Sequence, residues 1–173
     1  MPLTADMLKQ NPNPCFIETG TYRGDAVATA LGLGFGRVIT VEWCPQWAKE
    51  AADRYKDDKR VQVIGGDSAD ALARILPDLT SPCTFWLDAH PLITPMPFFS
   101  VVFPLLRELL TIKRFLKGDG HVILIDDLRT FNEFDHKALM HAMRELWPDA
   151  AHSFCADRIV KDDVYCCKLT PCG

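Results

Sequence analysis

Acidic residues follow the apolar segments of this chain that are typical of buried β-strands. They are Glu18, Glu42, Asp67, Asp88 and the adjacent pair Asp126 and Asp127. In an open α/β sheet, parallel strands bring their carboxyl ends to one edge, and ligands bind beyond that edge. A single carboxylate there is typical of a helix N-cap or a solvated loop. Acids at the ends of all the predicted parallel strands indicate instead a ligand with a positive charge, sugar hydroxyls or a metal ion.

The first apolar segment runs into a turn that contains two glycines, Glu18-Thr-Gly20-Thr-Tyr-Arg-Gly24-Asp. Gly20 allows a sharp backbone turn, and Gly24 allows a close approach between helix and strand. The helix that follows offers free N–H groups to an anionic group such as a carboxylate. The spacing differs from the G-x-G-x-x-G of dinucleotide-binding proteins. Glu42, at the end of the second segment, is placed as an acid that holds ribose hydroxyls.

Short apolar segments alternate with longer amphipathic ones along most of the chain. Strands are expected at 15–19, 37–42, 61–66, 83–88 and 120–126, and helices at 23–33, 45–57, 68–76, 104–116 and 135–147. This alternation predicts a parallel sheet with helices on both faces. Two further strand-like segments, 152–160 and 163–169, are separated only by Lys161 and Asp162, which can connect only antiparallel strands. The predicted fold is a Rossmann-like, doubly wound α/β sheet of seven strands, five parallel plus a C-terminal antiparallel hairpin.

Length and composition limit the classes of protein to consider. The 173 residues are expected to form one domain, residues 1–173. A content of 48% hydrophobic and 24% charged residues excludes a disordered chain or a coiled-coil rod. The longest apolar stretch, 97–110, is too short to span a bilayer, and the N-terminal segment lacks the apolar core of a signal peptide. A net charge of −4 without a basic cluster argues against nucleic acid or anionic membranes as partners. We therefore expect a cytoplasmic protein.

The chain contains seven cysteines. With no export signal before them, we expect reduced thiols that behave as small hydrophobic side chains. Cys166, Cys167 and Cys172 offer a metal site as an alternative, but no Cys-x-x-Cys pair is present and adjacent cysteines in a strand point to opposite faces.

Five motifs in this order resemble the class I S-adenosylmethionine-dependent methyltransferase superfamily: ETGTYRG, VITVEW, GGDSAD, FWLDAH and HVILIDD. The resemblance extends over nearly the whole chain and includes the terminal hairpin. It implies that S-adenosylmethionine is the cofactor and that its methionine part is held by Glu18, Gly20, Thr21 and Gly24. It further implies that Glu42 binds the ribose, Trp43 lies beside the adenine, and Asp67 accepts from the adenine amino group, with Ser68 adjacent. Packing of Trp43 against the second helix and an N-cap role for Asp67 are the structural alternatives.

Asp88, Asp126 and Asp127 end two strands that are expected to be neighbours in the sheet. Three carboxylates at one point repel one another unless a cation lies between them, and oxygen ligands favour Mg²⁺ or Ca²⁺. Catechol-type O-methyltransferases carry a metal at similar positions, although their third ligand is usually an amide where this chain has Asp127. The alternative is that Asp126 binds backbone or substrate and Asp127 points to solvent.

The candidate catalytic residues are Asp88 and His90, which follow the fourth strand. An imidazole with a pKa near neutrality is suited to act as a general base on a substrate hydroxyl or amine. His121 lies at the opposite end of the sheet and is expected to be structural. The apolar segment 96–103 is expected to cover a substrate or to form a homodimer.

These features predict a methyltransferase that moves a methyl group from S-adenosylmethionine to an oxygen or nitrogen of a small-molecule acceptor, with divalent-metal assistance as an option. Two alternatives remain open at this point. One is a non-catalytic binding module with the same fold, and the other is an enzyme that binds a nucleotide or NAD.

Overall fold

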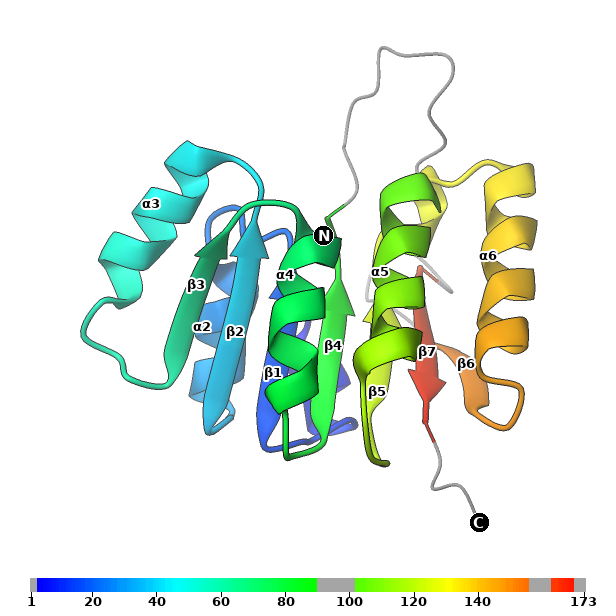
Figure 1. Ribbon diagram of the computed structural model, residues 1–173, viewed down its shortest axis with the longest axis horizontal. Coiled ribbons are helices and arrows are strands. Elements are labelled where there is room, and N and C mark those ends of the chain that lie inside the picture. Colours follow the sequence, from blue (N-terminus) through cyan, green and yellow to red (C-terminus); the bar gives the residue numbers. More distant parts are fainter. Residues whose placement is uncertain (1–2, 90–101, 156–162, 170–173) are drawn as a thin grey trace.

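The computed structural model describes residues 3–89, 102–155 and 163–169, and for residues 102–104 only the backbone. Its centre is a seven-stranded sheet in the order β3-β2-β1-β4-β5-β7-β6 (Figure 1). The strands are β1 (Cys15–Thr19), β2 (Arg37–Glu42), β3 (Val61–Gly65), β4 (Cys83–Leu87), β5 (Val122–Ile125), β6 (Ala151–Cys155) and β7 (Val164–Lys168). β1 to β5 pair in parallel, and β7 lies antiparallel between β5 and β6. The predicted fold class is confirmed.

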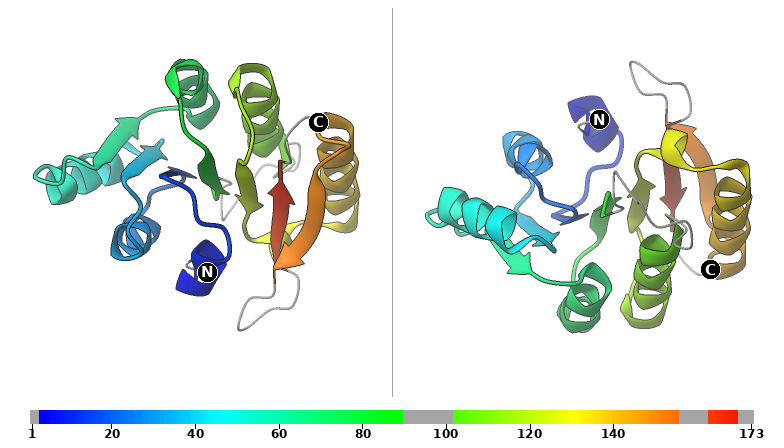
Figure 2. Two further views of the ribbon diagram at one scale, coloured as in Figure 1. Left: turned by 90° about the horizontal axis from the view of Figure 1, so that it is seen from below. Right: turned by 90° about the horizontal axis from the view of Figure 1, so that it is seen from above.

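Helices cover both faces of the sheet (Figure 2). They are α1 (Ala5–Lys9), α2 (Asp25–Gly32), α3 (Pro45–Tyr55), α4 (Ser68–Ile75), α5 (Val102–Phe115) and α6 (Glu133–Leu146), with the short 3₁₀ helices η1 (Leu76–Asp78) and η2 (Leu128–Thr130). One core unites α4, α5 and α6 with one face of the sheet, and a second core unites α1 and α2 with the other. Within the described residues, no helix combines the length and apolarity that crossing a membrane requires.

The central strands are buried along their whole length because helices cover both sides. Every residue of β1, β4 and β5 is buried, including the Val-Ile-Leu-Ile sequence of β5. Successive side chains of a strand point to opposite faces, so Ile123 belongs to the first core and Leu124 to the second. Apolar residues at every position, as in β5, therefore identify a central strand.

The N-terminal helix α1 is an element that the sequence pattern did not predict. Thr4 caps it, and the chain after it is attached to the sheet by asparagines. The Asn13 amide donates to the hydroxyl of Thr84 and to the carbonyl of Gly120, at 3.2 and 3.1 Å. The Thr84 hydroxyl in turn donates to the carbonyl of Asn11 at 2.7 Å. Since α1 has only five residues, it shows no helical periodicity that a sequence analysis could detect.

The terminal hairpin has a different register from the predicted one. β6 and β7 are antiparallel as expected, but Val164 pairs with Cys155. A two-residue turn at Lys161 and Asp162 would instead pair Val164 with Ile159. The register that a tight turn would give is therefore wrong, because the sequence of residues 152–160 does not determine where pairing begins.

Candidate functional site

The turn after β1 lies directly against the end of β4. Gly20 has φ = +88°, and its amide donates to the carbonyl of Val41 on β2 at 2.9 Å. A Cβ atom at Gly20 would lie 2.5 Å from the carbonyl oxygen of Asp88, closer than real Cβ contacts come. Both the backbone angle and the close approach therefore require glycine at this position.

The same turn leads directly into the N-terminus of α2. Tyr22 has φ = +45°, and Gly24, the N-cap of α2, has φ = +76°. The Gly24 amide closes the turn on the carbonyl of Thr21 at 2.8 Å. The hydroxyl of Tyr55 on α3 donates to the Gly24 carbonyl at 2.9 Å. The turn is thus held in one conformation at the carboxyl edge of the sheet.

Glu42, at the end of β2, connects this turn to the next one. Its carboxylate accepts from the amide of Tyr22 and from the amide of Cys44, both at 2.8 Å. Cys44 is the N-cap of α3, so the Glu42 side chain links the turn between β1 and α2 to the turn between β2 and α3. Each carboxylate oxygen has a second lone pair. Glu42 can therefore keep both amides and still accept the hydroxyls of a ribose, as the sequence predicts.

Glu18 is the most strongly perturbed acid of the site. Its side chain is buried beneath the turn, and its Oε2 accepts from the hydroxyl of Thr40 at 2.7 Å. Burial raises the pKa of Glu18 to about 8; the Thr40 hydrogen bond opposes this increase, and nearby carboxylates add to it, namely Asp88, Glu42 and Asp25. Without a cation near it, Glu18 is mainly protonated at neutral pH. A positively charged ligand would favour its ionised form.

Asp67 precedes α4, and the structure gives it the N-cap role that was one of its two alternatives. Its Oδ1 accepts from the amide of Asp70 at 3.1 Å, and its Oδ2 forms an ion pair with Arg107 of α5 at 2.8 Å. Partial burial raises the pKa of Asp67, but the Asp70 amide and the Arg107 guanidinium lower it further, with a net decrease. Ser68 is the first residue of α4. Asp67 therefore caps α4 whether or not it also binds a ligand.

Trp43 projects into solvent beside Glu42. The residue is 80% exposed, so the alternative that it packs against the following helix is wrong. The aromatic contact in this region is made by Tyr22 and Trp47 instead, whose ring centroids are 4.7 Å apart. The exposed indole beside Glu42 leaves an aromatic face available for a planar ligand.

A second acidic group lies where β5 ends. Asp126, Asp127 and Asp163 can bring one carboxylate oxygen each to within 4.8 Å of one another. Arg129 forms ion pairs with both Asp127 and Asp163, and its amide donates to Asp163 at 2.9 Å. Asp127 itself has φ = +57°, a conformation that aspartate tolerates better than most residues.

Asp126 remains outside these ion pairs. Its Oδ1 accepts from the amide of Asp127 at 2.7 Å, whereas its buried Oδ2 has no hydrogen-bond partner among the described residues. Burial raises the pKa of Asp126 to about 7, and the charges of Asp88 and Asp127 add to this increase.

This group does not fit the predicted divalent metal site. Among the described residues, the set within 4.8 Å contains Asp163 in place of Asp88. Two of its three carboxylates already bind the Arg129 guanidinium. A guanidinium in that position supplies the positive charge that was expected from Mg²⁺ or Ca²⁺, and we therefore derive no chemical step through a metal ion. The alternative that Asp127 points to solvent is also wrong, since Asp127 is buried.

Comparison with solved structures identifies the architecture. Cofactor-bound Rv0187 from MTB matches with a TM-score of 0.65 and 21% identity, over 99% of this chain and 83% of that one. The O-methyltransferase TomG from Streptomyces achromogenes, in complex with SAM, matches with a TM-score of 0.67 and 15% identity, over 96% and 77%. The chain has the class I methyltransferase fold. The O-methyltransferase from Bacillus cereus, in complex with SAH, matches with a TM-score of 0.65 and 17% identity, over 95% and 78%. No family model and no curated protein matches the sequence.

In the methyltransferase fold, the carboxyl edge of the sheet is the place where a ligand binds. The structure places most predicted site residues there, on β1, β2, β4 and the turns that follow the strands; they are Glu18, Gly20, Thr21, Gly24, Glu42, Trp43, Asp67, Ser68 and Asp88. His90 and residues 96–101 lie outside the described residues, so a catalytic imidazole and a dimer through segment 96–103 stay predictions.

His121 lies at the opposite edge, as expected for a structural residue. Its Nδ1 accepts from the amide of Cys83 at 3.1 Å, and its Nε2 lies 3.0 Å from the carbonyl of Lys117. These contacts require the neutral ring with a proton on Nε2. Burial lowers the pKa of His121 accordingly.

Three charged residues of this methyltransferase fold were missed by the sequence analysis: Arg107, Arg129 and Asp163. Each of them pairs with a residue that is distant in the sequence. Arg129 and Asp163 are 34 residues apart, and Arg107 and Asp67 are 40 residues apart. The signal available in the sequence was the arginine two positions after Asp127, because a cation so close to paired acids indicates a local ion pair.

Proposed function

We propose that this chain transfers a methyl group from S-adenosylmethionine to an oxygen or nitrogen of a small-molecule acceptor. The observation that carries the proposal is Glu18, buried beneath the glycine turn with a pKa raised to about 8 by burial and by neighbouring acids. Such a site gains most from a ligand with a positive charge. S-adenosylmethionine has two, the ammonium of its methionine part and the sulfonium that bears the methyl group.

The glycine turn and Glu18 would hold the methionine part of the cofactor. The turn leaves the N-terminus of α2 at the edge of the sheet, where N–H groups suit the methionine carboxylate. Glu42 would accept the ribose hydroxyls with its free lone pairs, and Trp43 would cover the adenine. Asp67 and Ser68, at the start of α4, would lie at the adenine edge.

When bound, S-adenosylmethionine supplies an electrophilic methyl group on a cationic sulfur. The residues of this chain would act mainly by position, because an in-line displacement depends on the alignment of the acceptor with that carbon. Asp88 lies at the end of β4 beside the turn, and it is the described candidate to accept the acceptor's proton. His90 is the second candidate for this role.

The acceptor is proposed to be a small molecule. Two of the structural matches are described as O-methyltransferases in complex with SAM or SAH, which favours oxygen as the methylated atom. Segment 96–103 would cover the acceptor or form a homodimer. We propose a cytoplasmic location for the enzyme and no role for nucleic acid or membranes.

Calorimetry with three ligands tests the cofactor assignment: S-adenosylmethionine, S-adenosylhomocysteine and NAD. We expect the first two to bind and NAD to fail, because the acidic edge repels a pyrophosphate. Glu42→Ala should weaken binding by about 1–3 kcal/mol, a factor of about 5 to 150, because it removes the acceptor of the ribose hydroxyls. Glu50→Ala, which removes an exposed carboxylate of α3, is the matched control and should leave binding unchanged.

Each result has a definite meaning. Binding of NAD in preference to S-adenosylhomocysteine, or equal affinities of the Glu42→Ala and Glu50→Ala variants, would refute the assignment. Transfer of a labelled methyl group to a panel of small phenols, alcohols and amines then tests catalysis. Cofactor binding without transfer to any of them would support a binding module rather than an enzyme.

A further inference from the structure

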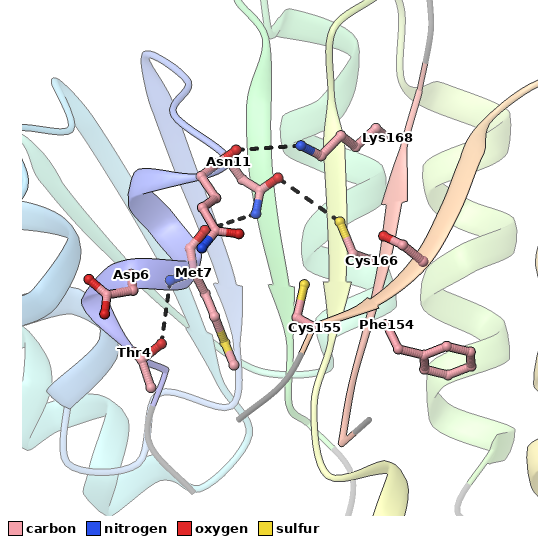
Figure 3. Close-up of a pocket in the computed structure, with 10 residues that line it drawn as sticks. Thr4, Asp6, Met7, Asn11, Phe154, Cys155, Cys166 and Lys168 are labelled. Carbon is pink, nitrogen blue, oxygen red and sulfur yellow. Dashed lines mark hydrogen bonds between the residues drawn. The ribbon is translucent and has the colours of Figure 1, made fainter. Parts of the chain in front are cut away.

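A cavity of about 340 Å³ lies between α1 and the β6–β7 hairpin, and none of the predicted cofactor-binding residues lines it. Figure 3 shows its lining, with the side chains of Cys155 and Cys166 on the hairpin and those of Met7 and Asn11 on the N-terminal segment. Nothing in the proposed methyl transfer uses these residues. Two thiols that share a cavity require a separate explanation.

The register of the hairpin places the two cysteines on the same face. Cys155 pairs with Val164, and Cys166 pairs with Ser153, so the two cysteines are diagonal neighbours on adjacent strands. Each thiol shifts the pKa of the other, which is lowered for Cys166 and raised for Cys155. Cys167 points to the other face and belongs to the other core, so it cannot replace Cys166 in this pair.

Opposing contacts act on the Cys166 thiol. It donates to Oδ1 of Asn11 at 4.0 Å, a bond that ionisation would lose, whereas the ammonium of Lys168, which lines the same cavity, favours the thiolate. The neighbouring Cys155 thiol lowers the pKa of Cys166 to about 7, against the effect of burial, and Ser153 and Lys168 lower it further. Cys166 in turn raises the pKa of Cys155. Cys166 is thus the nucleophile of the pair, and Cys155 holds the proton.

We propose that Cys155 and Cys166 form a peroxide-reactive dithiol that closes into a reversible disulfide. The Cys166 thiolate attacks hydrogen peroxide, so that an S–O bond forms, the O–O bond breaks, and hydroxide leaves and is protonated to water. The Cys155 sulfur then attacks the sulfenic sulfur; the S–S bond forms, and the S–O bond breaks with loss of water. In sum, two thiols are oxidised to one disulfide, and one peroxide is reduced to two waters.

Mobility of the hairpin is required for this reaction. Cys166 lines the cavity but is 1% exposed, whereas Cys155 is partly exposed, so a movement of the hairpin must open the sulfur of Cys166 to peroxide from the cavity. Diagonal neighbours in an antiparallel pair have Cα atoms about 7–8 Å apart, slightly farther than a disulfide allows. β6 is the edge strand, with β7 as its partner in the sheet, so it can make the small shift that the bond requires.

The chain contains a matched pair of cysteines outside this cavity. Cys15 and Cys83 are directly paired on β1 and β4, and each thiol shifts the pKa of the other, which is lowered for Cys15 and raised for Cys83. Both residues are buried in the first core. If cavity access decides reactivity, this pair should stay reduced under conditions that oxidise Cys155 and Cys166.

The experiment treats the reduced full-length protein with increasing hydrogen peroxide, blocks the remaining thiols after unfolding, and maps tryptic peptides by mass spectrometry. Cleavage at Arg158 and Lys161 separates the two cysteines, so a disulfide joins peptides 145–158 and 162–168, and fragmentation of the linked pair distinguishes Cys166 from Cys167 in the second peptide. We expect this linked pair as the first product and its loss after treatment with dithiothreitol. Cys44, a partly exposed single thiol, reports the ordinary reactivity of this chain.

Two variants separate the steps. Cys155→Ser should stop the reaction at a sulfenic acid on Cys166 that dimedone traps, and Cys166→Ser should slow oxidation of Cys155 to the rate of Cys44 or below. Mapping of the wild-type protein alone decides the proposal if either variant fails to fold. A Cys15–Cys83 disulfide as the first product, a bond to Cys167 or Cys172, or reduced Cys155 and Cys166 after Cys44 has reacted would overturn it. The result does not depend on whether the chain transfers methyl groups.

Discussion

Replacement of Gly20 by alanine tests the close approach that shapes the site. The backbone angle of +88° costs an alanine about 1–2 kcal/mol. The new methyl group would also lie 2.5 Å from the carbonyl oxygen of Asp88, so β1 and β4 must separate at this point. Overpacking of this kind costs about 1–3 kcal/mol. We therefore expect Gly20→Ala to lower the free energy of unfolding by about 2–5 kcal/mol.

Gly34 provides the matched control. Its φ is +87°, almost the same as that of Gly20, but a Cβ atom there would meet nothing within 4 Å. Gly34→Ala should thus lose only the backbone contribution, about 1–2 kcal/mol. Urea denaturation followed by tryptophan fluorescence measures both variants. Equal losses would show that the contact between the turn and Asp88 does not exist in solution, and the description of the site would fail.

Three further predictions concern single side chains. Glu18→Gln should remove a pH dependence of stability. The carboxyl of Glu18 has a pKa of about 8 in the folded protein against an ordinary value of 4.5, so between these values the folded protein keeps a proton that the unfolded chain has lost. The free energy of unfolding of the wild type should therefore fall as pH rises from 4.5 to 8, which urea titrations at several pH values can follow. His121 acts in the opposite sense. Because burial lowers its pKa, the free energy of unfolding should fall as pH decreases below about 6.5. The His121→Phe variant should lose this sensitivity to acid, although the variant should be less stable than the wild type at neutral pH. Trp43→Ala should change the free energy of unfolding by less than about 0.5 kcal/mol, since the side chain is 80% exposed, yet weaken S-adenosylhomocysteine binding by about 1–3 kcal/mol in calorimetry.

The strands of the central sheet could be predicted because their signals are local. Residues 122–125 are apolar at every position, which only a strand covered on both faces requires. The position of the site at one edge followed from the same reasoning, since parallel strands end together. Gly20 and Glu42 were correctly placed there, and the contacts of Glu42 with two backbone amides explain why an acid stands at that position even without a ligand.

The features that could not be predicted depend on contacts between distant segments. Arg129 forms ion pairs with Asp127, one of the expected metal ligands, and with Asp163. Asp163 directly precedes β7 and is distant from Arg129 in the sequence. The register of the hairpin depends on the whole antiparallel pairing of β7, and the sequence of 152–160 is compatible with more than one register. Side-chain pairing across the fold leaves no periodic signal in the sequence.

The order β5-β7-β6 has a consequence for synthesis on the ribosome. β6 leaves the ribosome before β7, yet β7 is its partner in the sheet. Until β7 has been translated and inserted, β5 presents an unpaired and fully apolar edge, the kind of surface on which chains associate with one another. The five strands from β3 to β5 in the sheet order can form during translation, whereas β6 and β7 must wait and are then added together. Premature termination anywhere before β7 would release a chain that aggregates rather than a smaller version of the same fold.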